Sequence, residues 1–240
     1  MRAASNAIAL SYFKHGDTSV IAHFFTELWG IHSFVIKGIR SKKSRFSTAT
    51  LQPFTRIEVE ANVKPGQTLS TLSQLKLLEA PSQTPFLLTK SSIAIFLSEV
   101  LLHSLGKNEK NTPLFQFVET AAQVLDNTDH PENFHLYFLL HYTRYLGFFP
   151  GNSWSEHNSV FNILEGHFEA PRQGNQHQLH ERQSKQLSLI LSTPLTEIEL
   201  LPFSRTERSK LLKDILLFLS VHLDGMKKIH SLDVLETVFS

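Results

Sequence analysis

The 240-residue sequence contains no cysteine. Disulfides, thiol catalysis and thiolate metal sites are therefore excluded, while the redox compartment stays open because a cysteine-free chain tolerates either environment. The sequence also has no apolar run long enough for the core of a signal peptide or for a membrane span. Together these absences predict a cytoplasmic protein.

The short motifs that mark most enzyme active sites are missing as well. There is no glycine-rich phosphate loop, no Gly-x-Ser-x-Gly turn around a nucleophile and no His-Glu-x-x-His metal motif. The carboxylates Glu58 and Glu60 alternate with apolar residues, which is typical of the exposed face of a strand. We therefore expect a protein that is not an enzyme and that needs no cofactor.

Positive charge is present but unevenly distributed. The formal net charge is only +1, yet residues 1–80 hold 10 Lys and Arg against 5 Asp and Glu, which gives +5. Residues 81–240 hold 13 against 17, which gives −4. Such asymmetry favours a polyanion, either nucleic acid or a membrane surface, as the partner of the first third of the chain.

Residues 1–80 are predicted to form a small β domain. Polar and apolar residues alternate from Arg56 to Glu60, and further short β-prone runs are separated by turn sequences. About five short strands with few helices between them favour a closed barrel or a sandwich.

Residues 81–240 are predicted to form an all-α helical bundle, so the whole chain is α+β and multidomain. One helix is expected behind Thr112 as its cap and Pro113 as its first residue. A nearly all-apolar segment predicts a buried central helix that ends at Gly147. Residues 151–182 are polar and rich in histidine, and we expect an irregular excursion there.

Two more helices are predicted near the C-terminus of the sequence. Ser204 and Glu207 have the spacing of a capping box ahead of an apolar-periodic run, and Ser231 is a plausible cap for the last helix.

A dense basic run lies between two β-prone segments of the first domain. Such a run is often a plain solvated loop, but this one is held at both ends and can present its charges as a surface. A basic loop on a small barrel suits single-stranded nucleic acid, because cations follow the phosphates while aromatic faces stack with bases. The expected nucleic-acid-binding residues are Lys37, Arg40, Lys42, Lys43, Arg45, Phe46 and Lys14.

Aromatic residues flank this loop. Tyr12, Phe13 and Phe34 are candidates to stack with bases, but taken singly each is expected in the core, because a small barrel needs large side chains to fill it. Phe46 lies inside the polar loop, so it is the one aromatic residue expected to be exposed.

The series HGDTSVIAHFFTELWGIHSFVIKGIRSKKSRF, followed by LQPF, resembles the N-terminal region of the RecO family of bacterial recombination and repair mediators. Downstream, SSIAIFLSEVLLHSL, NTPLFQFVETAAQVLD, YLGFFP and VHLDGMKKIHSLDVLE are similar to the helical domain and C-terminus of that family. The resemblance covers nearly the whole chain and is weakest over residues 151–182.

This resemblance implies an OB-fold followed by a helical domain. It also implies binding to single- and double-stranded DNA, strand annealing, and action with RecR and single-stranded-DNA-binding protein (SSB) in loading RecA, within the RecFOR pathway at the nucleoid. In the family, the acidic and apolar tail of SSB docks on the helical domain, and Arg144 is the candidate cation for that contact, unless it only caps or pairs inside a buried helix.

The chain departs from the family at one site. Many family members carry a four-cysteine zinc site after the YLGF segment, and this chain has no cysteine with which to form it. Four histidines crowd the same region, but without a carboxylate motif they are weak evidence for a metal, and we expect none. These histidines are His157, His167, His177 and His180.

Two other functions are compatible with the sequence. The basic loop could contact structured RNA in a non-catalytic RNA-binding or scaffold module, which a preference for RNA at matched salt would reveal. A hydrolase with a histidine-bound metal would instead require bound metal, which elemental analysis detects.

Overall fold

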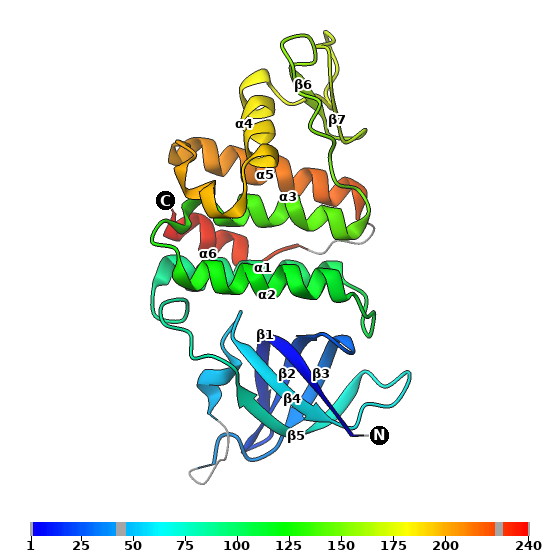
Figure 1. Ribbon diagram of the computed structural model, residues 1–240, viewed down its shortest axis with the longest axis vertical. Helices are drawn as coiled ribbons and strands as arrows, with labels where there is room; N and C mark the ends of the chain where they lie inside the picture. The colour runs from blue at the N-terminus through cyan, green and yellow to red at the C-terminus, as the bar shows by residue number, and fades with distance from the viewer. Residues whose placement is uncertain (1, 42–46, 224–227, 240) are drawn as a thin grey trace. The chain divides into compact units, whose positions relative to one another are not determined.

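A computed structural model describes residues 2–41, 47–223 and 228–239 (Figure 1). The chain forms two compact units, Met1–Thr128 with Ile229–Val238, and Asp129–Lys228 with Phe239–Ser240. Within the described residues, no helix combines the length and the apolar character needed to cross a membrane.

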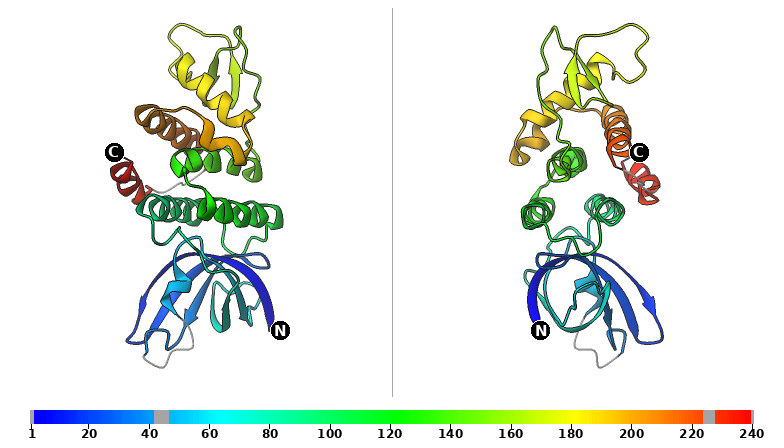
Figure 2. Two further views of the ribbon diagram at one scale, coloured as in Figure 1. Left: turned by 60° about the vertical axis from the view of Figure 1, so that its left-hand side comes forward. Right: turned by 90° about the vertical axis from the view of Figure 1, so that its right-hand side faces the viewer.

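The first unit contains a closed five-stranded barrel with the order β1-β2-β3-β5-β4 (Figure 2). β3 pairs in parallel with β5, and the other strand pairs are antiparallel. This arrangement is the OB type of small barrel, and it confirms the fold class expected from the sequence. The strands are β1 (Ala3–His15), β2 (Ser19–Thr26), β3 (Gly30–Ile36), β4 (Arg56–Ala61) and β5 (Leu69–Leu77), with the 3-10 helix η1 (Thr48–Leu51) between β3 and β4.

Alternation along the strands builds the barrel core. In β4, Ile57 and Val59 are fully buried while Glu58 and Glu60 are partly exposed, as the period-two pattern predicted. Phe24 and Phe34 stack inside the barrel with ring centroids 5.5 Å apart. Large side chains thus fill the interior.

Three helices belong to the same unit as the barrel. α2 begins behind Asn111, whose side-chain oxygen accepts a hydrogen bond from the Leu114 amide, so the cap is Asn111 and not Thr112. Phe115 of α2 contacts Phe25 of β2, with centroids 5.6 Å apart. The helices are α1 (Leu88–Ser104), α2 (Thr112–Asn127) and α6 (Ser231–Val238).

α6 joins this unit through α1. The Glu99 carboxylate accepts hydrogen bonds from the backbone amides of His230 and Ser231, at 2.9 and 2.8 Å. Helices that the sequence assigned to one domain spanning residues 81–240 therefore fall into both compact units. α1 packs against α6 and β1, and Phe115 of α2 contacts β2, whereas helical periodicity does not tell which surface a helix will cover.

One carboxylate fastens the segment between the barrel and α1. Asp126, near the end of α2, accepts hydrogen bonds from the backbone amides of Ser82, Gln83 and Thr84 at 2.7–3.0 Å, and from the Ser82 hydroxyl. Burial alone would raise the pKa of Asp126, but these hydrogen bonds outweigh it and hold the pKa well below its ordinary value. The carboxylate is therefore charged at neutral pH, and its hydrogen bonds are charge-assisted.

The second unit is mainly helical. α3 is largely buried and ends at Gly147, which adopts the left-handed conformation (φ 90°), so the prediction of a buried helix with this end is confirmed. The capping box of Ser204 and Glu207 also forms at the start of α5. α4 was not expected from the sequence. The helices are η2 (Pro131–Asn133), α3 (Phe134–Leu146), α4 (Glu181–Ser192), η3 (Leu195–Leu200) and α5 (Arg205–His222).

The excursion expected at residues 151–182 is not irregular throughout. It contains a two-stranded antiparallel sheet, β6 (Val160–Asn162) and β7 (His167–Glu169). The Phe161 ring lies 5.5 Å from that of Phe218 on α5, and His222 Nε2 donates to the Ile163 carbonyl at 2.9 Å. Apolar residues at 160, 161, 163 and 168 thus give this hairpin a small core, which the polar composition around them had hidden.

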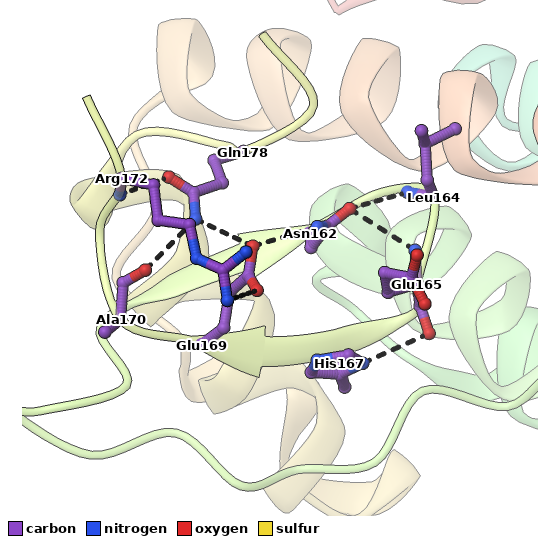
Figure 3. A network of polar contacts seen from close by, with 8 residues as sticks. All are labelled: Asn162, Leu164, Glu165, His167, Glu169, Ala170, Arg172 and Gln178. Carbon is purple, nitrogen blue, oxygen red and sulfur yellow. Dashed lines mark hydrogen bonds and ion pairs between the residues drawn. The ribbon is translucent and has the colours of Figure 1, made fainter. Parts of the chain in front are cut away.

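A polar network holds the next turn of the chain against this hairpin (Figure 3). One Glu169 oxygen accepts hydrogen bonds from the side-chain amides of Asn162 and Gln178, at 2.9 and 2.7 Å. The second Glu169 oxygen faces Arg172 at 3.7 Å. Hydrogen bonds from Gln178 and Asn162 lower the pKa of Glu169, so it is ionised at neutral pH and joins three segments at once.

We expect Asp126→Asn to destabilise the first unit by about 2 kcal/mol, because the substitution removes the charge that strengthens its hydrogen bonds. Urea unfolding at neutral pH measures the loss. Asp129→Asn is the matched control, because Asp129 is exposed. Equal stability of the two variants would contradict the proposed contribution of Asp126.

We expect Glu169→Ala to speed hydrogen exchange at the Ile163 and Leu179 amides, which bond across the hairpin to His177 and Phe161. Glu165→Ala is the control, since Glu165 takes part in the network through its backbone alone. Unchanged exchange in Glu169→Ala would mean that the aromatic contacts alone hold the hairpin.

Candidate nucleic-acid interface

Two rows of side chains face outward across strands β1, β2, β3 and β5, and we call them the open face of the barrel. They alternate with core residues such as Ala22 and Phe34, so they point away from the interior. None of the eight residues is acidic. One row is Phe13, Ile21, Val35 and Thr71, and the other is Ser11, His23, Ser33 and Leu69.

Most residues of these rows are partly or fully exposed, and Ser33 is the one buried member. The next outward row holds Phe25 and Ile31, and both are almost fully buried because α2 and the segment after α1 cover them. Phe13 and Leu69, in contrast, are 50% and 41% exposed. The open face is therefore an apolar and aromatic surface that water reaches.

Phe13 and His23 form a ring pair on this face. Their centroids are 5.7 Å apart with the planes tilted by 40°, and His23 Nδ1 lies 2.8 Å from the Ser33 hydroxyl. Burial, aided by the nearby positive charge of Lys107, lowers the pKa of His23. The imidazole is therefore neutral at pH 7 and offers an uncharged ring.

Cations lie near both ends of the open face. Lys37 follows the last residue of β3, and Lys14 lies near the end of β1; both are exposed. Lys107 forms a β-bridge with Ile31 at the opposite end. Within the described part of the chain, Lys14, Lys37 and Lys107 form no ion pair.

Arg40 ties the start of the basic loop to the barrel. Its backbone amide donates to the Thr18 carbonyl at 3.0 Å, and its guanidinium donates to the Asp17 carbonyl at 3.2 Å. The side chain is exposed and makes no ion pair with another described residue. Arg40 thus keeps its charge available beside the β1–β2 turn. The remaining expected residues of this loop, Lys42, Lys43, Arg45 and Phe46, lie outside the described residues.

The flanking aromatic residues divide between core and surface. Phe34 is fully buried, as expected, but the expectation was wrong for Tyr12 and Phe13, which are 37% and 50% exposed. β1 is 13 residues long, and its last four residues are all exposed although they pair with β2 as far as His15 and Ser19. Composition does not show which side of a strand an aromatic side chain will face.

Sequence reasoning missed His23 and Lys107. Period-two alternation with the buried Phe24 could have placed His23 on the outer surface. No sequence signal places Lys107, because a tertiary contact positions it. Its neighbour Asn108 donates from its backbone amide to the Ile31 carbonyl at 3.1 Å, and its side-chain oxygen lies 2.8 Å from His32 Nδ1.

Arg144, the expected partner-binding cation, lies on α3 in the second unit. It is exposed, and its guanidinium carbon lies 4.1 Å above the centroid of the Phe149 ring. The side chain thus lies at the surface in the last turn of α3, although the helix itself is largely buried. The ring of His141 lies 5.5 Å from Phe149, so the cation stacks on an aromatic column beside α3.

The four histidines considered as metal ligands, His157, His167, His177 and His180, are all exposed. In the part of the chain that the structure describes, no three His, Cys, Asp or Glu side chains are grouped as metal ligands would be. Glu169 is occupied by the amides of Asn162 and Gln178, and the hairpin has its own apolar core. That the protein needs no metal remains a prediction.

Comparison with known proteins agrees with this architecture. Residues 1–81 match the family model described as Recombination protein O N terminal, and residues 86–232 match Recombination protein O C terminal. The chain is 37% identical to the DNA repair protein RecO of Flavobacterium psychrophilum and 36% identical to that of Flavobacterium johnsoniae, over the full length of both chains. It is 31% identical to the DNA repair protein RecO of Christiangramia forsetii over 98% of each chain.

The order of an OB-type barrel and helices, the two family models and the full-length similarity lead to one conclusion. The chain belongs to the RecO family of DNA repair and recombination proteins.

Proposed function

We propose that this protein is a non-catalytic mediator of homologous recombination. It binds single- and double-stranded DNA, anneals complementary strands, and acts with RecR to load RecA onto DNA coated with SSB. The open face supports DNA binding most directly, because the exposed ring of Phe13 and the half-buried ring of His23 lie near cations that form no ion pair with a described residue, and none of its eight residues is acidic.

The chemistry of this face suits a nucleic-acid strand. Phosphates are neutralised by Lys14, Lys37 and Arg40, and we expect the three further cations of the basic loop, Lys42, Lys43 and Arg45, to contact phosphates as well. Strand annealing needs a surface that holds phosphates without covering every base edge. Loose electrostatic contacts from a loop meet that need, since they bind any sequence.

Partner contacts are assigned to the second unit. The tail of SSB is acidic and apolar, and Arg144 offers an exposed guanidinium stacked on Phe149 beside an apolar helix. The planar guanidinium can bind a carboxylate with two parallel hydrogen bonds. Support for RecR, and through it the RecA filament, comes from membership of the RecO family.

We expect the triple substitution Lys42→Ala, Lys43→Ala and Arg45→Ala to flatten the slope of log K against log salt by about 2 for single-stranded DNA, because each released counterion contributes about −0.7. Fluorescence anisotropy with a labelled oligonucleotide measures this slope.

As a control, Lys76, Lys210 and Arg205 are replaced by Ala, which removes the same number of positive charges from exposed sites away from the loop. The salt slope of this control should equal that of the unmodified chain. If the loop variant has the same salt slope as the unmodified chain, the loop charges do not contact phosphates and the loop is only a solvated segment. Stronger binding to RNA of matched sequence and salt would favour the RNA-binding alternative instead.

We expect Arg144→Ala to weaken the binding of a peptide that ends in acidic residues and Phe by about 10-fold or more, since a charge-assisted contact is lost. Calorimetry should use the full chain, because residues 82–128 belong to the first compact unit and a fragment starting at residue 82 would divide it. Lys185→Ala removes another exposed cation of the second unit and is the control. If Arg144→Ala and Lys185→Ala bind the peptide with equal affinity, the peptide binds at another site.

A further inference from the structure

Phe13 is an exposed ring on a rigid support. It pairs with Ile21 on β2, which pairs in turn with Val35 on β3, and both of these residues are only partly exposed. Side chains in such a row stand roughly perpendicular to the sheet and restrict one another. Phe24 and Phe34 are fully buried inside the barrel, whereas Phe13 and its neighbour Tyr12 are 50% and 37% exposed, and Phe13 is the one of these two in the outward row.

His23 extends the same surface by one ring. Its centroid is 5.7 Å from that of Phe13, and the contact with the Ser33 hydroxyl fixes its orientation. Diagonal neighbours on adjacent strands are close enough to act on one ligand. The two rings, tilted by 40° to each other, therefore form one contiguous aromatic surface.

The charges on and around the open face indicate which aromatic ligand it binds. The open face has no acidic residue, and exposed cations lie near both of its ends, with Lys37 and Arg40 at one end and Lys107 at the other. A chain with flat rings and a repeating negative charge matches this pattern. Single-stranded nucleic acid has both features, because its bases are free to stack while its phosphates meet the cations.

In a duplex, by contrast, the bases stack on one another and only the backbone is accessible to the same cations. We propose that Phe13, with His23 beside it, is a base-stacking platform that selects single-stranded over duplex DNA on a barrel whose cations bind both. This inference rests on the proposed DNA-binding function and adds the residues that distinguish the two forms of DNA.

The test compares the full-length chain with Phe13→Ala by fluorescence anisotropy, using a labelled oligonucleotide and its duplex at one salt concentration. We expect Phe13→Ala to weaken single-strand binding about 10-fold, with duplex affinity and the salt slope unchanged. Phe13→Tyr keeps a ring and should bind as the unmodified chain does. Phe86→Ala removes a ring that is 76% exposed before α1, away from the open face, and should have no effect.

An oligonucleotide of the same length made of abasic sites provides a second probe. It should bind the unmodified chain and Phe13→Ala with equal affinity, because it has phosphates but no bases. If Phe13→Ala loses stability in a melting measurement, Phe13→Leu with the abasic probe replaces it, since leucine keeps apolar contact but offers no ring.

The outcomes separate this inference from the proposed function. If the unmodified chain binds neither DNA, the proposed function fails and this inference fails with it. If it binds DNA and the loop variant weakens binding while Phe13→Ala does not, the platform alone is overturned. Equal losses on both DNA forms, or an unchanged preference for bases over the abasic probe, also overturn it.

Discussion

The parallel ladder between β3 and β5 closes the barrel, and most features of the first unit depend on it. Ser33, Phe34 and Val35 pair there with Leu69, Ser70 and Thr71. Closure gives every strand two neighbours, so each side chain points either into the barrel core or away from it. Phe34 faces inward while Val35 faces outward for this reason, and the open face is the outward set that remains.

The helices of the first unit decide how much of that outward set reaches water. Phe115 of α2 covers Phe25, and Asn108 fixes the segment after α1 against β3 through Ile31 and His32. The Asp126 hydrogen bonds fasten the segment that leads into α1. These contacts cover one end of the sheet, while Phe13 is exposed and His23 is half-buried toward the other end.

In the second unit, polar and aromatic contacts hold the β6–β7 hairpin in a region where the chain has no cysteine. Glu169 joins Asn162 and Gln178, while Phe161 anchors the hairpin to Phe218. Charge-assisted hydrogen bonds are directional, and aromatic contacts bury apolar area. Together these contacts hold the hairpin in place, as disulfides or a bound metal ion do in other small subdomains.

Local patterns in the sequence determined the barrel followed by helices, the alternation in β4, the end of α3 at Gly147 and the capping box at Ser204, because each depends on residues close together along the chain. The charge asymmetry likewise pointed to the basic loop. Only the tertiary structure decided that α1, α2 and α6 belong with the barrel, that residues 160–169 form a hairpin, and that Phe13 is exposed beside His23. These outcomes depend on which surfaces meet across long sequence separations, and periodicity identifies an apolar face without identifying what covers it.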